Sequence, residues 1–171
     1  MPRHTHPILG LDPGLKDLGW TVIDGRRLVG HGVIALRLTP RAERRAEARR
    51  RLRALIVAHR PRAIAIEKTY PHPVPWLHEL HLLTLDVRRM ARAQRIPVAT
   101  YASQAVRATV ASNGKAKKPA VAIAIAQRFR SLRVYLTQDR VWKERFWLNM
   151  FDAAALALHH QLLTQPPSRS R

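Results

Sequence analysis

Residues 8–20 read ILGLDPGLKDLGW, an apolar run that stops at Asp12 and Pro-Gly and resumes at Leu18. Apolar residues also alternate or cluster in GWTVID (residues 19–24) and in LVGHGVIAL (residues 28–36), and Asp24-Gly25 separates these two runs. Runs of this length, bounded by Gly, Pro and Asp, are typical of strands joined by turns. The first 36 residues therefore predict three strands in an antiparallel meander.

The rest of the chain alternates helical and strand patterns. The run at residues 62–67 is apolar almost throughout, which is typical of a central strand buried on both faces. A second strand is predicted at residues 97–101. Helical spacing of apolar residues predicts helices at residues 41–60, 76–95, 103–111, 118–133 and 146–163. This order predicts an α/β fold, a mixed five-stranded sheet of three antiparallel strands followed by parallel strands, flanked by helices.

The length and the charge point to one basic domain. A chain of 171 residues can bury one core but not two large ones, so we expect a single domain over residues 1–163 and a disordered basic tail over residues 164–171. The 31 Lys and Arg against 11 Asp and Glu give a net charge of +20, which predicts a nucleic acid partner. The excess of 25 Arg over 6 Lys fits either phosphate recognition or the codon usage of a GC-rich genome.

The sequence lacks residues and motifs that several kinds of functional site and some cellular locations require. There is no cysteine, so disulfides, thiolate zinc sites and cysteine nucleophiles are ruled out. No apolar run reaches the ~18 residues that span a bilayer, and no signal peptide is apparent, so we expect no membrane contact and a location in the cytoplasm, at the nucleoid. Neither an ATP-binding G-x-x-x-x-G-K-S/T motif nor a serine-hydrolase G-x-S-x-G motif occurs.

Three acidic residues follow or interrupt apolar sequence. Asp12 ends ILGLD, Glu67 ends AIAIE, and Asp152 opens DAAALALHH. A buried carboxylate needs a cation, hydrogen bonds or a metal, because its desolvation costs several kcal/mol. Asp12 and Glu67 end predicted strands, where open sheets place ligands, and Asp152 lies on a helix that could cross that edge. The alternative for each is ordinary: a turn residue, a strand-end charge, or a helix residue paired with arginine.

If the three carboxylates meet, their chemistry favours a hard divalent cation. Oxygen ligands without Cys or a clear His partner suit Mg²⁺ or Mn²⁺ better than zinc. His78 with His81, and His159 with His160, lack a third ligand at recognisable spacing, which argues against a zinc site. In a basic protein such a site indicates phosphodiester hydrolysis, where two ions ~4 Å apart activate a water and stabilise the leaving oxygen.

Four ordered blocks of the sequence resemble the RuvC family of Holliday-junction resolvases. They are ILGLDPGLKDLGW at residues 8–20, AIEKTY at 65–70, IPVATYASQAVRATVASNGKAKK at 96–118 and DAAALALHH at 152–160. The resemblance implies an RNase H-like fold, a homodimer, and symmetric nicking of four-way DNA junctions with divalent metal. It also implies that a branch-migration helicase complex, on separate chains, is a partner.

The resemblance assigns roles to individual residues. Asp12, Glu67 and Asp152 match the metal-binding carboxylates of the family. Tyr70 falls where the family has an aromatic that stacks at the opened crossover, although it could be a plain surface tyrosine. Basic residues that contact junction phosphate match Arg107 and Lys118. The patch continues through Lys115 and Lys117, for which a solvated loop is the alternative.

The chain also departs from the family pattern. Asn149 stands three residues before Asp152, where the family has Asp or His, and its uncharged amide predicts weaker binding of one metal ion. Residues 135–149 are longer than the usual connection, and they form either an extra DNA-contacting element or part of the core. The helix at residues 76–95 lacks the small-residue pattern of the family's dimer helix. Further residues of interest in the long connection are the aromatic Trp142, Phe146 and Trp147 and the acidic Asp139 and Glu144, either of which could supply a missing acid.

We therefore predict a metal-dependent endodeoxyribonuclease that resolves four-way junctions. One alternative is another RNase H-like nuclease, acting on RNA–DNA hybrid, flap or structured RNA. A second alternative is a junction-binding protein whose active site is weakened at Asn149. An architectural basic protein ranks last, because it would leave three buried acids unexplained.

Overall fold

The computed structural model describes residues 6–137 and 141–164, and of residues 141, 142, 144 and 145 it describes the backbone. Its centre is a five-stranded sheet in the order β3-β2-β1-β4-β5. The strands are β1 (Ile8–Asp12), β2 (Asp17–Asp24), β3 (Arg27–Ala35), β4 (Ala63–Glu67) and β5 (Val98–Tyr101).

The predicted meander and the predicted parallel strands are both confirmed. β1 pairs antiparallel with β2, and β2 pairs antiparallel with β3 across a turn in which Gly25 has a φ of +59°. Glycine adopts this left-handed conformation without steric cost. β4 pairs in parallel with β1 and with β5, so Glu67 lies beside Tyr101. The sheet is therefore mixed, and the carboxyl ends of β1, β4 and β5 share one edge.

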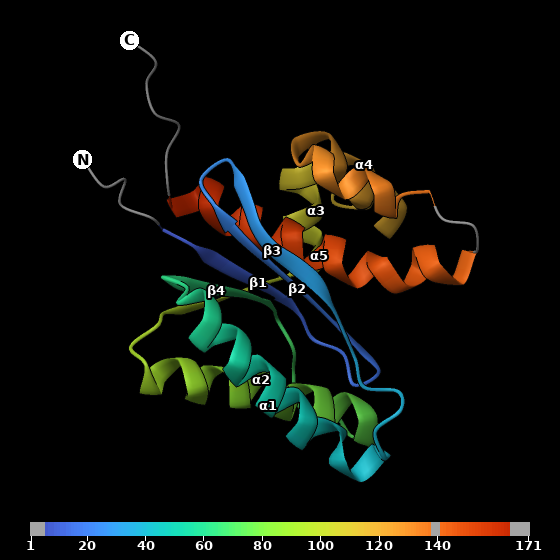
Figure 1. Cartoon of the computed structure of the whole chain (residues 1–171). Helices are drawn as coiled ribbons and strands as arrows, with labels where there is room; N and C mark the ends of the chain where they lie inside the picture. Colours follow the sequence, from blue (N-terminus) through green and yellow to red (C-terminus); the bar gives the residue numbers. More distant parts are fainter. Residues whose placement is uncertain (1–5, 138–140, 165–171) are drawn as a thin grey trace.

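The helices form one layer on each face of the sheet (Figure 1). One layer holds a 3₁₀ turn η1 (Arg41–Glu43), α1 (Arg44–His59) and α2 (Pro75–Ala93). The other layer holds α3 (Ser103–Ala111), α4 (Lys118–Arg128), a 3₁₀ turn η2 (Arg130–Tyr135) and α5 (Val141–Thr164). Within the described residues, none of these helices is both long and apolar enough to cross a membrane.

Four of the five predicted helices have boundaries that differ from the prediction, α1 and α2 by one to three residues at each end and the two last ones by more. The helix expected over residues 118–133 ends at Arg128, because the buried Phe129 has an extended backbone and the chain continues as η2. The last helix begins five residues earlier than expected and reaches Thr164, one residue beyond its expected end. Residues 165–171 of the expected tail lie outside the described residues.

The long connection is partly core. Trp147 lies in the extended N-terminal part of α5, and its ring centroid is 4.4 Å from that of Tyr135 and 5.0 Å from that of Phe146. Trp147 and Tyr135 pack against the buried cluster formed by α4 and α5, which confirms the core alternative for Trp147. The side chains of Asp139, Trp142 and Glu144, named above as candidates, lie outside the described residues.

Two glycines let α5 lie directly on the sheet. A Cβ atom at Gly10 of β1 would overlap the backbone carbonyl of Ala153, and one at Gly19 of β2 would overlap that of Asn149. Any larger residue would push the helix away, because neither neighbour is a movable side chain. This close approach places Asn149 and Asp152 beside the end of β1, where Asp12 lies.

We expect Gly10→Ala to destabilise the protein by about 3 kcal/mol, since overpacking against a fixed backbone costs more than a rotamer change. Thermal and urea denaturation of the two proteins would measure the difference. Gly25→Ala is the control: its Cβ meets no atom within 4 Å, so only backbone strain of about 1 kcal/mol is expected. Equal losses at the two positions would contradict the close approach of α5.

Candidate active site

The fold brings the three predicted carboxylates to one place. β1 and β4 are adjacent parallel strands with Leu11 beside Ile66, so Asp12 and Glu67 follow side by side at the same edge. α5 crosses the sheet above them and carries Asp152. Asp12 is only 6% exposed, and the side chain of Asp152 is 19% exposed.

Lys118 lies among these carboxylates. It is the first residue of α4, and its Nζ is 2.5 Å from Oδ2 of Asp152 and 3.8 Å from Oδ2 of Asp12. The same Nζ donates to Oδ1 of Asn149 at 3.3 Å. The sequence groups Lys118 with the phosphate-contacting residues of the preceding loop, whereas the structure makes its ammonium the cation at the centre of the acidic group.

The electrostatics show that one ammonium does not satisfy this group. Burial raises the pKa of Asp12 well above its usual value; Lys118 opposes this rise, and Asp152 and Glu67 add to it. Burial likewise raises the pKa of Asp152, against the opposing effect of Lys118. Burial would lower the pKa of Lys118, but the carboxylates outweigh it and raise that pKa. The site therefore favours additional positive charge.

Asn149 completes the group from the same face of α5 as Asp152. Its Nδ2 donates to the backbone carbonyl of Asp17 at 2.9 Å, while its Oδ1 faces Lys118. The amide thus joins the first residue of β2 to the acidic site. This placement puts Asn149 beside the carboxylates and gives its nitrogen a bonding role that a carboxylate could not fill.

Ser103 is a member of the site that the sequence did not reveal. Its Oγ donates a hydrogen bond to Oε1 of Glu67 from the first residue of α3. It lies two positions after Tyr101, which pairs with Glu67 in the sheet, so strand register was the signal that could have identified it. Ser103 orients the carboxylate of Glu67.

A small cavity of about 60 Å³ opens between these residues. Its polar walls are Glu67, Ser103, Arg107, Lys118 and Asp152. The cavity has room for waters or small ions beside the carboxylates. Arg107 also lowers the pKa of Asp152, which places its charge near the carboxylates.

The other predicted DNA-binding residues lie outside the carboxylate group. Tyr70 follows β4 and is 62% exposed, with Nζ of Lys68 at 5.1 Å from its ring centroid. Lys115 and Lys117 are exposed on the loop before α4. These side chains are open to a large ligand that approaches the cavity.

The donor set suits a hard divalent cation, although no closed metal cage is present. Within the part of the chain that the structure describes, no three His, Cys, Asp or Glu side chains are arranged to hold one ion. The carboxylates instead surround the Lys118 ammonium, which supplies the positive charge that a cation would supply. Three carboxylates and an amide oxygen are the donors that Mg²⁺ and Mn²⁺ prefer.

The histidine pairs make other bonds. Nδ1 of His81 lies 3.2 Å from Oγ1 of Thr69, and Nδ1 of His160 lies 2.6 Å from the Tyr101 hydroxyl. His159 bonds Thr109 in the same way. These three histidines therefore each contact a hydroxyl group.

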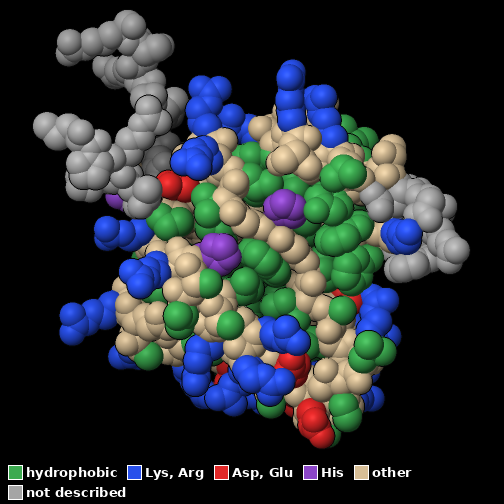
Figure 2. Space-filling model, viewed as in Figure 1, with side chains coloured by type: hydrophobic (Ala, Val, Ile, Leu, Met, Phe, Trp, Pro, Cys, Tyr) green, Lys and Arg blue, Asp and Glu red, His purple; other side chains and the backbone are tan. Residues whose placement is uncertain are grey.

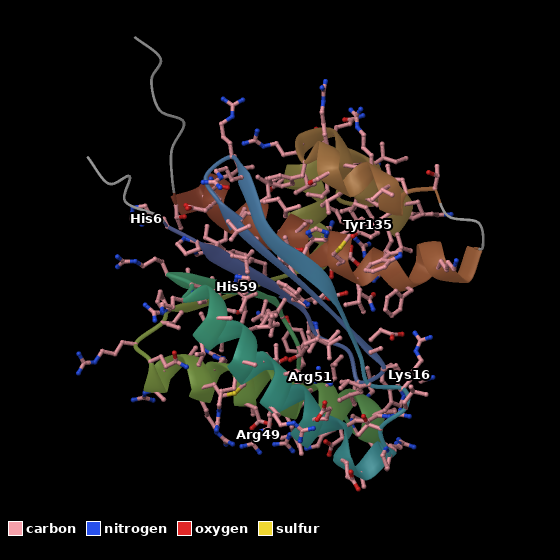
Figure 3. All side chains as sticks on the ribbon, in the orientation of Figure 1. His6, Lys16, Arg49, Arg51, His59 and Tyr135 are labelled. Carbon is pink, nitrogen blue, oxygen red and sulfur yellow. The ribbon has the colours of Figure 1, made fainter. Side chains whose placement is uncertain are left out.

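Asp86 is a second buried acidic residue, and the side chains around it differ from those around the carboxylate group. Asp86 of α2 is 3% exposed, yet Nε of Arg45 lies 2.7 Å from its Oδ2, and Arg49 and Arg89 lie within 4 Å. Arg49 lies in the layer formed by α1 and α2 (Figure 3). Arginine therefore neutralises a structural acid in this protein, whereas the edge of the sheet gathers several acids around one lysine.

Comparisons with known proteins agree with this geometry. Residues 8–160 match the family model described as crossover junction endodeoxyribonuclease RuvC. A protein of that name from Xanthobacter autotrophicus is 37% identical over 124 residues, covering 69% of this chain and 73% of its own length. Another, from Myxococcus xanthus, is 33% identical over 166 residues and covers 90% and 78%.

Solved structures show the same fold. RuvC of Thermus thermophilus in complex with a Holliday junction substrate superimposes with a TM-score of 0.73 at 24% identity, covering 94% of this chain and 95% of that one. The yeast mitochondrial Holliday junction resolvase Ydc2 superimposes with a TM-score of 0.57 at 12% identity, covering 92% and 82%. The RNase H-like architecture expected from the sequence is thereby confirmed.

We expect Asp12→Asn to stabilise the metal-free protein at neutral pH by about 1 kcal/mol, because a neutral amide avoids the cost of ionising a buried carboxyl. The folded-state pKa of Asp12 is raised above its unfolded value, so the cost to the wild type is absent below the unfolded pKa and grows as pH rises above it. The difference in melting temperature should therefore shrink toward pH 4.

Thermal denaturation in a chelator, measured from pH 4 to pH 8, would test this expectation. Glu43→Gln is the matched control, since Glu43 is exposed on η1 and its neutralisation should leave stability almost unchanged. A melting temperature for Asp12→Asn that is below the wild-type value at pH 7 would show that the ionised Asp12–Lys118 contact outweighs the burial.

Proposed function

Because this chain belongs to the RuvC family of crossover junction endodeoxyribonucleases, we propose that it resolves four-way DNA junctions by metal-dependent phosphodiester hydrolysis, nicking two strands symmetrically. One observation carries the proposal: Asp12, Glu67 and Asp152 meet at one edge of the sheet although they come from three separate elements. Such an acidic group is costly unless it serves a cation, because burial and mutual repulsion disfavour the ionised carboxylates.

The proposed cofactor is Mg²⁺ or Mn²⁺, with two ions per site. Asp12, Glu67 and Asp152 would hold it, and the Asn149 oxygen is a further neutral donor. When bound, such ions activate a water for attack on phosphorus and neutralise the charge of the leaving oxygen. Ser103 keeps the Glu67 carboxylate oriented for this role.

Lys118 and Arg107 are proposed to hold the scissile phosphate. Both line the small cavity, and the Lys118 side chain is 41% exposed, so its ammonium can leave the carboxylates and reach a phosphate oxygen. Lys115 and Lys117 extend this contact along the backbone. Phosphate contacts position a substrate without reading its sequence.

Tyr70 is proposed to stack on a base at the opened crossover. Its ring is exposed and stands three residues after Glu67, which puts an aromatic face next to the site. Stacking on an aromatic contributes about 1–3 kcal/mol per base and tolerates any sequence. Junction preference would arise here, because unpaired bases occur at a crossover and not in plain duplex.

The proposed function also implies an oligomeric state, a protein partner and a cellular location. A homodimer would give two active sites related by the two-fold symmetry of the junction, as paired nicks require. The chain has no ATP-binding motif, so branch migration would need a separate helicase complex as partner. An enzyme of this kind would act in the cytoplasm on DNA of the nucleoid.

We expect cleavage of a labelled synthetic four-way junction in Mg²⁺ or Mn²⁺, as paired symmetric nicks, and at least a 10³-fold loss of rate in Asp12→Asn. Gel analysis beside duplex, flap and RNA–DNA hybrid would define the substrate. Asp12→Asn should still bind the junction, since Asp12 is buried and removing its charge does not weaken a phosphate contact.

The other outcomes separate the alternatives. Faster cleavage of hybrid or flap than of the junction would favour another RNase H-like nuclease. Tight, salt-sensitive junction binding without cleavage at any metal concentration would favour a binding protein. Single unpaired nicks would contradict the homodimer.

We expect Asn149→Asp to lower the metal concentration for half-maximal cleavage by about tenfold, because an added charged oxygen ligand raises affinity for a hard cation. Metal titrations of junction cleavage would measure it. Asn113→Asp is the control, since Asn113 is an exposed amide on the loop before α4. An unchanged metal requirement would show that Asn149 does not limit metal binding.

A further inference from the structure

A second, larger groove lies beside the active site, on the α1–α2 side. Its volume of about 610 Å³ is in the range of ligand pockets. Residues 14–16 of the turn between β1 and β2, with Asp17 at the start of β2, form one wall, and the first turns of α1 and α2 form another. Asn149 is part of the lining, so the groove begins where the carboxylate group ends.

The acids in the lining are already paired. The guanidinium of Arg37 forms an ion pair with Asp17, and Nη1 of Arg45 lies 3.8 Å from Oε2 of Glu79. Arg45 also bonds Asp86, as described above. The acidic side chains of the groove therefore add little net negative charge to it.

Three cations of the lining remain uncompensated. Among the described residues, no carboxylate forms an ion pair with Lys16, Arg41 or Arg44. Nε of Arg44 donates to the carbonyl of Thr39 at 2.9 Å, which holds the guanidinium in place without neutralising it. Lys16 projects from the β1–β2 turn (Figure 3). Such fixed positive charge is complementary to phosphate.

An exposed aromatic faces the same groove. Trp76, in the first turn of α2, is 53% exposed. A large ring left open to water beside uncompensated cations is the combination that binds single-stranded nucleic acid, with bases on the ring and phosphates on the cations. In the view of Figure 2, Lys and Arg cover much of the α1–α2 layer, and the few acids lie among them.

The connection to the active site is direct. Asn149 accepts from Lys118 on one side and donates to the carbonyl of Asp17 on the other, so one amide separates the cavity from the groove. A strand whose phosphate lies at the carboxylates can therefore continue into the groove. Tyr70 follows β4 and is absent from the residues that line the groove. Trp76 would therefore contact other nucleotides than Tyr70 does.

We propose that this groove binds the unpaired nucleotides adjoining the scissile phosphate, with a base stacked on Trp76 and the phosphates held by Lys16, Arg41 and Arg44. The inference rests on the proposed junction-cleaving function and names a binding surface that function does not require. Its consequence is that the enzyme senses strand opening in the strand to be cut, in addition to any stacking at Tyr70.

The test measures metal-free binding of a labelled four-way junction and of a fully paired duplex across a range of salt concentrations. Trp76→Ala should weaken junction binding about tenfold and duplex binding little, because only the junction offers unpaired bases. Trp76→Phe should retain most of the junction affinity. Lys16→Ala and Arg44→Ala should each lower the slope of log affinity against log salt by about one for both DNAs.

Two controls come from exposed residues outside the groove. Arg53→Ala removes a charge from the middle of α1, and Ile123→Ala removes an exposed apolar side chain from α4; both should bind junction as the wild type does. The proposal is overturned if the wild type cleaves the junction while Trp76→Ala and Lys16→Ala bind it like these controls. A wild type that neither binds nor cleaves a junction would overturn the proposed function and this inference together.

Discussion

The close contact between α5 and the sheet is the constraint on which the rest of the structure depends. Glycine at positions 10 and 19 allows the backbone of α5 to touch β1 and β2, and no side chain separates them. A helix held at this distance brings Asp152 to the end of β1, where Asp12 is buried. The geometry of the candidate active site is thus a consequence of backbone packing.

The same packing buries the acidic site, and this burial lowers the stability of the folded protein. Asp86 shows that this arginine-rich chain can neutralise a buried carboxyl with several guanidinium groups. At the sheet edge it instead places Asp12, Glu67 and Asp152 around the single ammonium of Lys118, so burial and mutual repulsion raise the pKa values of Asp12 and Asp152. A local loss of folding stability of this kind is typical of a site that binds a ligand.

Sequence patterns predicted the sheet and the three carboxylates because both depend on local signals: apolar runs ended by acids, and turns marked by Gly and Pro. They did not reveal that Lys118 enters the carboxylate group or that Ser103 bonds Glu67, because these contacts join residues 34 or more positions apart through strand register. The early end of α4 at Phe129 was also missed, since burial of that ring, and not helix propensity, decides it. The groove at Trp76 depends on four separate elements and leaves no pattern in any one of them.

Asn149 contacts both the acidic site and the start of β2. Its amide nitrogen donates to the Asp17 carbonyl, which holds the β1–β2 turn against α5, and its oxygen faces Lys118. A carboxylate at this position would strengthen a cation site but would place an acceptor against the Asp17 carbonyl and lose the bond to the turn. That turn carries Lys16 and the groove wall. The amide therefore gives up ligand charge at the acidic site and keeps its bond to the adjoining groove wall, so the departure from the family pattern is compatible with an active enzyme.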